Sequence, residues 1–206
     1  MFTGIVQLNA PVVSVIKRSG LLHVALELGE AFVIGLERGA SVAVDGVCLT
    51  ALDIKGGRVA FDVMQETLEK TSLSSLAIGR RVNVERSTRF GDEVGGHVVS
   101  GHVTGVGEII DVRQSENNQV VTFRVPQTWM KYILPKGFIA LDGASLTIVD
   151  VDRVNNTFTV ALIPETLRLT TFGWKREGDR VNVEIDSRTQ SIVDTVESYL
   201  EQRRSV

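Results

Sequence analysis

The chain has 206 residues, a comfortable length for two domains of about 90 to 100 residues each. Its composition, 43% hydrophobic and 23% charged, is that of an ordinary globular protein and excludes an intrinsically disordered chain. A net charge of −3 provides no basic field for a nucleic-acid backbone, and no apolar run approaches the roughly 18 residues of a membrane span. We therefore expect neither a nucleic acid nor a membrane as a partner.

Two further features concern the cellular compartment. The first residues, Met1 to Val6, lack the basic stretch and the apolar run of a signal peptide. The single cysteine, Cys48, excludes an internal disulfide and a multi-thiolate metal site. Together these features predict a soluble protein of the cytoplasm.

The chain contains an internal repeat with a spacing of about 99 residues. Three blocks recur in the same order: Ala40–Thr50 as Gly137–Thr147, Glu66–Leu68 as Glu165–Leu167, and Gly79–Glu85 as Gly178–Glu184. Thr3-Gly4 is matched with Thr104-Gly105. The period is too long for a solenoid unit, so we expect two copies of one domain, residues 1–94 and 95–186, followed by a separate segment, residues 187–206.

Short β-rich runs separated by turn signals dominate each copy. In the first copy an Asp45-Gly46 pair lies between two such runs, as Asp142-Gly143 does in the second. An Asp-Gly pair in this setting is typical of a hairpin, because glycine accepts a positive φ. About six strands fit in each copy, and closure into a barrel removes the exposed edges of an open sheet. We predict an all-β protein of two tandem six-stranded β-barrels.

Three segments have helical patterns. Two are short, Glu66 to Leu76 and Val125 to Leu134. The third is the C-terminal segment, whose apolar side chains fall on one stripe: Ile192, Val193, Val196, Tyr199 and Leu200. This C-terminal α-helix has no counterpart in the first copy. It packs back on the barrels or associates with copies of itself.

The segment between the copies, Phe90 to Val103, is rich in glycine and carries two of the three histidines, His97 and His102. Histidine transfers protons near neutral pH, so both are candidate acid–base groups. The alternative for either one is an exposed loop histidine. A zinc site is not indicated, because further ligands are lacking.

Cys48 is a candidate nucleophile if a histidine close in space favours its thiolate, and a small buried residue otherwise. The second copy has Ser145 at the same position, so both copies present a small polar atom. Thr50 and Thr147 follow two residues later and therefore lie on the same strand faces. Asp186 ends the last strand pattern and is either a cap of the C-terminal helix or a catalytic group.

These residues resemble the riboflavin synthase family over essentially the whole chain. The segments that carry the resemblance are Met1–Val6, Val44–Thr50, Gly95–Val103, Gly143–Thr147 and Leu162–Leu167. The resemblance implies that two molecules of 6,7-dimethyl-8-ribityllumazine exchange a four-carbon unit, giving riboflavin and 5-amino-6-ribitylaminouracil without a cofactor or metal. It also implies a homotrimer with an intersubunit active site, formed by the N-terminal barrel of one subunit and the C-terminal barrel of a neighbour, and an association with lumazine synthase.

The resemblance also implies a set of site residues. The catalytic set comprises His102, Cys48, Ser41, Phe2 and Asp186. The substrate contacts of the first pocket are Thr3, Gly4, Ile5, Val6, Cys48, Leu49, Thr50, Asp62, Val63, Met64, Gln65, Glu66 and Thr67. Those of the second are Gly101, His102, Val103, Lys136, Ser145, Leu146, Thr147, Ala161, Leu162, Ile163, Pro164, Glu165 and Thr166, and His97 is a further contact.

The sequence departs from the family pattern at two positions. Asp45 stands where many members have asparagine, and we expect it at its turn, away from the ligand. Thr104 stands where aspartate is common. Neither change is expected to abolish activity.

Two other classes of protein compete with this interpretation. A non-catalytic relative, similar to the lumazine proteins that bind a lumazine or flavin as an optical antenna, keeps the barrels but loses the polar catalytic set. This chain keeps Ser41, Cys48, His97 and His102. A flavin-binding barrel of a reductase requires a nicotinamide domain, for which the chain has no room.

Overall fold

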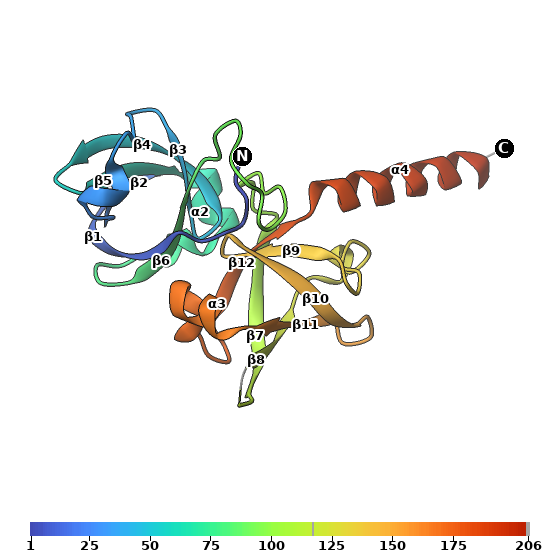
Figure 1. The fold of residues 1–206 in the computed structure, drawn as a ribbon. Coiled ribbons are helices and arrows are strands. Elements are labelled where there is room, and N and C mark those ends of the chain that lie inside the picture. The colour runs from blue at the N-terminus through green and yellow to red at the C-terminus, as the bar shows by residue number, and fades with distance from the viewer. Residues whose placement is uncertain (117, 205–206) are drawn as a thin grey trace.

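The computed structural model describes residues 1–116 and 118–204 and contains two closed antiparallel barrels of six strands each. Figure 1 shows the barrels side by side. The first barrel is ordered β1-β2-β5-β4-β3-β6 and the second β10-β11-β8-β7-β12-β9. The predicted fold class is therefore confirmed.

The strands of the first barrel are β1 (Leu8–Arg18), β2 (Leu21–Glu27), β3 (Ser41–Val44), β4 (Val47–Lys55), β5 (Arg58–Met64) and β6 (Arg81–Arg86). Those of the second are β7 (Gly105–Gln114), β8 (Gln119–Arg124), β9 (Phe138–Leu141), β10 (Ala144–Asp152), β11 (Thr157–Leu162) and β12 (Arg180–Ile185).

Each barrel encloses its own apolar core, because alternate strand residues point inward. In the second barrel Phe123 stacks on Phe158 with ring centroids 5.4 Å apart, and Phe172 meets Phe123 edge-on. The first core is built largely from valine and leucine around Phe61. The outward-facing residues of the strands are thereby left free to form sites.

Short helices connect the strands. The α-helices are α1 (Glu30–Val33), α2 (Gln65–Lys70) and α3 (Pro164–Leu169), and the 3-10 helices are η1 (Ser72–Ser75), η2 (Gln127–Trp129) and η3 (Thr171–Gly173). The helix predicted over residues 66–76 is present as α2 and η1. The helix predicted over 125–134 is wrong: the segment forms only η2 and turns, because its amides bond to the carbonyl three residues back, as Trp129 does to Pro126 and Tyr132 to Trp129.

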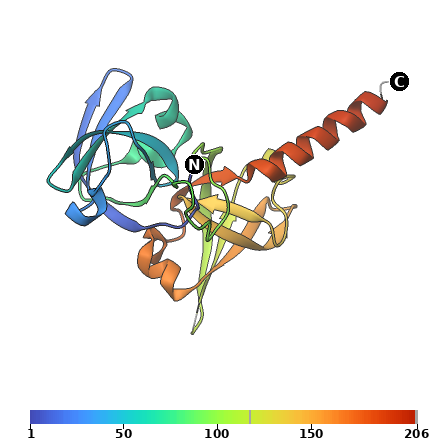
Figure 2. The ribbon, with the colours of Figure 1, turned by 45° about the horizontal axis from the view of Figure 1, so that its top comes forward.

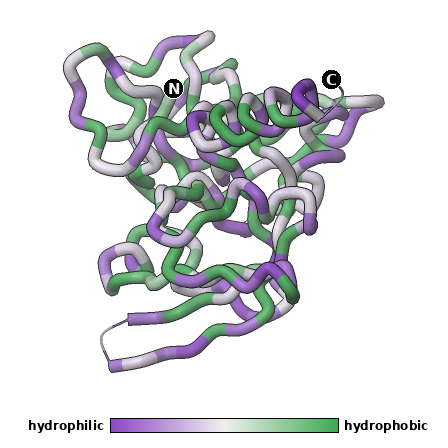
Figure 3. Tube along the Cα trace, turned by 90° about the vertical axis from the view of Figure 1, so that its right-hand side faces the viewer, coloured by the Kyte–Doolittle hydropathy of each residue, from purple (hydrophilic) through white to green (hydrophobic). Residues whose placement is uncertain are grey.

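The long helix α4 (Ser187–Arg204) is present as predicted. It begins after Asp186, whose carboxylate accepts hydrogen bonds from the amide and hydroxyl of Thr189, so Asp186 caps the helix. Figures 1 and 2 show α4 extending away from both barrels, and Figure 3 shows hydrophobic and hydrophilic residues alternating along it. Across the described residues, no helix is long and apolar enough to cross a membrane.

The two hairpin turns, Asp45-Gly46 and Asp142-Gly143, lie back to back at the junction of the barrels. A Cβ on Gly46 would lie 2.6 Å from the amide nitrogen of Gly143, and one on Gly143 would lie 2.9 Å from that of Gly46. Both glycines also have a positive φ, near 80°. Glycine is therefore required at both turns, and the two barrels approach each other through their backbones.

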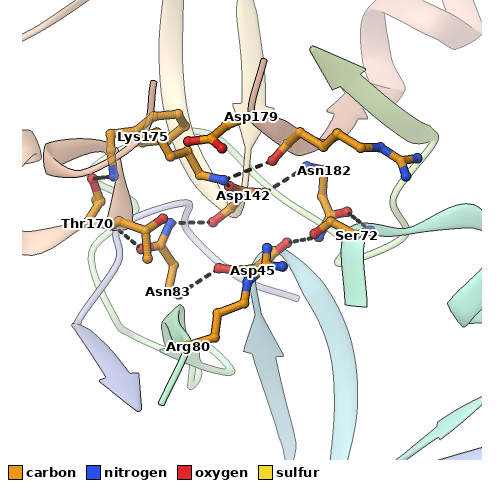
Figure 4. Close-up of polar contacts among 12 residues, drawn as sticks. Asp45, Ser72, Arg80, Asn83, Asp142, Thr170, Lys175, Asp179 and Asn182 are labelled. Carbon is orange, nitrogen blue, oxygen red and sulfur yellow. Dashed lines mark hydrogen bonds and ion pairs between the residues drawn. The ribbon is translucent and has the colours of Figure 1, made fainter. Parts of the chain in front are cut away.

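Two buried asparagines cross this junction in matching ways (Figure 4). The side-chain amide of Asn83 donates to the carbonyl of Asp142, and that of Asn182 donates to the carbonyl of Asp45. Each Asp carboxylate in turn accepts from the backbone amide of the Asn in its own barrel, Asp45 from Asn83 and Asp142 from Asn182. The two barrels are thus related by an internal two-fold arrangement, since each bond made by one copy is matched by the other.

The segments that precede the two barrels are exchanged between them. Glu85 of the first barrel holds the amides of Thr3 and Gly4, while the carbonyl of Gly4 accepts a hydrogen bond from the Ser145 amide of the second barrel, at 2.8 Å. In the same way Glu184 of the second barrel holds the amides of Ser100 and Gly101, while the carbonyl of Gly101 accepts from the Cys48 amide of the first, at 2.9 Å.

This arrangement corrects one part of the predicted alignment of the two copies. Thr3-Gly4 corresponds to Ser100-Gly101, not to Thr104-Gly105, because the bonds to Glu85 and Glu184 are the same. Phe2 and Val99, one residue earlier in each copy, exchange two backbone hydrogen bonds. A match of two residues was too short to reveal the correct alignment, which long-range contacts decide.

Candidate active site

A cavity of about 240 Å³ lies on the outer face of the first barrel; we call it the first-barrel pocket. Strand β4, helix α2 and the segment between the barrels form its walls. Its lining residues are Val47, Cys48, Glu66, Thr67, Lys70, Thr71, Gly101, His102 and Val103. Six of these are predicted site residues, Cys48, Glu66, Thr67, Gly101, His102 and Val103, and the structure brings them together.

The strand period explains why Cys48 faces this pocket. Its neighbours Val47 and Leu49 are buried in the barrel, so Cys48 points outward, as Thr50 does two residues later. Gly101 packs against Cys48: a Cβ on Gly101 would lie 2.5 Å from the Cys48 Cβ. The pocket therefore depends on glycine at position 101, where φ is also +82°.

The exchanged segments overturn the assignment of two predicted sets to pockets. Residues 101–103 were expected in the second pocket but line the first, because the Gly101 carbonyl bonds to Cys48 and Val103 packs on the first core. Residues 4–6 were expected in the first pocket but lie against the second barrel, where Gly4 bonds to Ser145 and Val6 belongs to the second core. Sequence order alone could not show this crossing.

His97 and Ser145 form the second-barrel site, which corresponds to the Cys48 region of the first barrel. The Nδ1 atom of His97 lies 2.6 Å from the Ser145 hydroxyl oxygen, and its ring stacks on Phe138 with centroids 5.2 Å apart. Burial lowers the pKa of His97, although the charges of Asp186 and Glu184 oppose this effect. The imidazole is therefore neutral at neutral pH and can exchange a proton with Ser145.

The remaining catalytic candidates occupy different surroundings. Phe2 is 1% exposed and packs in a small cluster with Ala43, Val99 and Ala140, next to Cys48, so it supports the first-barrel pocket from behind. Asp186 is close enough to His97 to affect its pKa and also caps α4. Its capping role is thus established by the contacts.

Five predicted substrate contacts have side chains that belong to the barrel cores. They are Val6, Leu49, Val63, Leu146 and Leu162, each no more than 8% exposed. Only their backbone groups are left for a ligand. Exposed or partly exposed side chains remain at other predicted contact positions, among them Ile5, Met64, Gln65, Lys136, Thr147, Ala161, Ile163, Pro164, Glu165 and Thr166.

Neighbouring strands of the first barrel carry a row of outward-facing polar residues, which we call the outer row: Ser41, Thr50, Asp62 and His23. Ser41 pairs with Thr50 across β3 and β4, and His23 pairs with Asp62 across β2 and β5. Ala51 pairs with Phe61 and both are buried, so Thr50 and Asp62 face outward side by side.

His23 is a residue that the sequence analysis missed. Its Nδ1 atom lies 2.7 Å from a carboxylate oxygen of Asp62. The alternation of β2, with Leu22 and Val24 buried, could have indicated that His23 faces outward, but its partner lies 39 positions away. Only the register between β2 and β5 brings the pair together.

Comparison with known proteins identifies the domains. The model of the lumazine binding domain matches residues 3–87 and 100–186, which are the two barrels. The solved structure of LumP complexed with riboflavin superposes with a TM-score of 0.84 at 24% identity and covers 91% of this chain and 100% of that one. LumP complexed with 6,7-dimethyl-8-(1'-D-ribityl) lumazine gives a TM-score of 0.80 at 25% identity, covering 89% and 98%. The chain is therefore a tandem lumazine-binding protein.

Sequence relatives narrow the class further. Riboflavin synthase of Escherichia coli (strain K12) is 49% identical over 206 residues, covering 100% of this chain and 96% of the relative. The riboflavin synthases of Chlamydia pneumoniae and Mycobacterium bovis are 44% and 41% identical; they cover 97% and 90% of this chain and 97% and 93% of their own. The chain belongs to the riboflavin synthase family. It is an enzyme of the transferase class, and the non-catalytic antenna alternative is not favoured.

Proposed function

We propose that this member of the riboflavin synthase family converts two molecules of 6,7-dimethyl-8-ribityllumazine to riboflavin and 5-amino-6-ribitylaminouracil on the outer faces of its two barrels. One observation carries the proposal. The two barrels present equivalent sites with unequal side chains, Cys48 beside His102 in the first and Ser145 bonded to His97 in the second. A reaction in which two copies of one ligand play different roles requires two similar binding sites that differ in their reactive side chains.

The reaction makes two chemical demands. One lumazine must lose a proton from its C7 methyl group, and the other must be activated at C7 by addition of a nucleophile. We assign proton transfer to His102, which is exposed and lines the first-barrel pocket. Cys48, in the same pocket, is the adjacent thiol and acts as a contact or as the nucleophile.

The second-barrel site supplies a second acid–base pair. A neutral His97, whose Nδ1 atom lies 2.6 Å from the Ser145 hydroxyl oxygen, can accept the hydroxyl proton as Ser145 adds to C7. If a water adds instead, it gives a proton to Ser145 while Ser145 gives its own to His97. Asp186 is assigned to this site as a charge that favours the protonated imidazole. Ser41 and Phe2 are assigned to the first barrel, on the outer row and behind Cys48 respectively.

A trimer with its active site between subunits is part of the proposal. Four large apolar side chains of α4 are half exposed or more, Ile192, Val196, Tyr199 and Leu200, and the helix extends away from the barrels (Figure 2). Such a stripe suits packing against neighbouring subunits. We also place the enzyme in the cytoplasm, consistent with its one free cysteine, and expect it to associate with lumazine synthase.

The deciding experiment mixes purified protein with 6,7-dimethyl-8-ribityllumazine and follows absorbance in the visible flavin band. Growth of one riboflavin for every two lumazines consumed supports the proposal. A bound, fluorescent lumazine without riboflavin formation contradicts it and favours the antenna function. Protein with both His102→Ala and Ser145→Ala provides the matched inactive control.

A further inference from the structure

Among the described strands, the hydrogen-bonded pair of His23 and Asp62 in the first barrel has no counterpart at the equivalent positions of the second barrel. Asp62 corresponds to Ala161 in the second barrel, and Ala161 pairs with Val120, which takes the place of His23. Ser41 corresponds to Phe138, and Thr50 corresponds to Thr147. Threonine is therefore the one residue type that the outer row shares with the equivalent positions of the second barrel. The outer row is thus polar in the first barrel and mostly apolar in the second.

The outer row adjoins the first-barrel pocket. Thr50 lies two residues after Cys48 on the same face of β4, and Asp62 stands beside Thr50 on β5. The side chain of Asp62 is 38% exposed, so its carboxylate is available to a ligand as well as to His23. A carboxylate accepts strong hydrogen bonds from hydroxyl groups, and the ribityl chain of the substrate carries several.

We propose that His23 is a positioning residue, which holds the Asp62 carboxylate in the orientation that binds the polyol chain of the lumazine on the first barrel. This inference rests on the proposed function, because it concerns the same site. His23 contacts Asp62 through Nδ1 at 2.7 Å with its side chain 23% exposed, so the imidazole restricts the carboxylate without blocking it. At the equivalent described positions the second barrel has Val120 and Ala161 in place of this pair, so its site presents a more apolar wall to the substrate.

The structure provides conservative variants for a test. His23→Val and Asp62→Ala install the residues that the second barrel has at the equivalent positions, Val120 and Ala161, where the same fold accepts them. His23→Asn retains a hydrogen-bond donor at about the place of Nδ1. The matched control is Glu27→Ala, which removes the Arg58–Glu27 ion pair at the other end of the same two strands.

The measurement is kcat and KM for 6,7-dimethyl-8-ribityllumazine, with the thermal midpoint of each variant. His23→Val is expected to raise KM about fivefold and to change kcat less than twofold, since one orienting hydrogen bond is lost. Asp62→Ala is expected to raise KM by 10-fold or more, because a charged acceptor is lost. His23→Asn should restore most of the wild-type KM, and Glu27→Ala should leave KM unchanged.

A double variant separates positioning from a direct contact. If His23 acts through Asp62, KM of His23→Val/Asp62→Ala equals that of Asp62→Ala alone. If the KM increases of the two single variants multiply in the double variant, the proposal is overturned. An unchanged KM in His23→Val also overturns it. If His23→Val does not fold, Asp62→Asn decides, since it keeps the shape but loses the carboxylate, and an unchanged KM overturns the proposal. Wild-type protein that makes no riboflavin refutes the proposed function instead.

Discussion

Replacing Asp45 with asparagine should stabilise the protein, by an amount that grows with pH. Asp45 is 1% exposed at the junction of the barrels. Burial, and secondly the charge of Asp142, raise its pKa from 3.8 to about 7, against the opposing effects of Lys175, the Asn83 amide and Arg80. Figure 4 shows these groups converging on the two turns.

The sign of the effect follows from the direction of this shift. The folded state binds the Asp45 proton more tightly than the unfolded chain, so the contribution of Asp45 to stability is greatest below a pH of about 4 and falls as pH rises toward 7. The loss amounts to roughly 4 kcal/mol above pH 7, at about 1.4 kcal/mol per pH unit. Asparagine cannot ionise, and its side-chain oxygen can still accept from the Asn83 amide.

The assay is urea unfolding of wild type and Asp45→Asn at pH 5, 6, 7 and 8. The stability difference between the two should grow by about 2 kcal/mol from pH 5 to 7 and then level off. A difference that is constant over this range would refute the reasoning. The matched control is Asp142→Asn, which leaves Lys175 buried without its 2.8 Å partner and should destabilise the protein by about 3 kcal/mol or more.

Three further changes test the site and the assembly. His102→Ala should lower kcat by 10²-fold or more while the Kd for lumazine, measured by fluorescence titration, changes only a few-fold; equal losses would make His102 a simple contact. Cys48→Ser should keep most of the turnover, because the second barrel has serine at this position, whereas a collapse of the rate would identify Cys48 as the nucleophile. Leu200→Asp, on the exposed stripe of α4, should shift the sedimentation coefficient toward that of a single chain without affecting the thermal midpoint. Gln202→Asp serves as the polar control. An unchanged sedimentation coefficient in Leu200→Asp would argue against trimerisation through α4.

Local patterns were sufficient to predict the architecture. Hairpin turns at Asp45-Gly46 and Asp142-Gly143, the repeat, and the C-terminal stripe were all readable because they depend on a few neighbouring residues. The outward direction of Cys48 and Thr50 also followed from the strand period. The helix predicted over residues 125–134 was wrong because the apolar residues of this segment suit either an α-helix or a series of tight turns, and packing decides between them.

The site was less predictable because its groups meet through long-range register. Nothing near Gly4 or Gly101 in the sequence indicates which barrel each will join, since the deciding partners, Ser145 and Cys48, lie far along the chain. Asp45 was placed correctly at its turn, but an Asp-Gly turn is usually exposed. Its burial results from the meeting of two such turns, which only the packing of one barrel on the other reveals.

The exchange of the leading segments means that neither half of the protein is self-sufficient. A fragment ending at residue 94 would keep Cys48 but lose Gly101, His102 and Val103, and so would lack one wall of its own pocket. Two such fragments could in turn repair each other, because the bonds made by Gly4 and Gly101 are equivalent under the internal two-fold arrangement. The covalent link between the barrels holds the two copies together, so each can differ in its polar residues while its shape depends on the other.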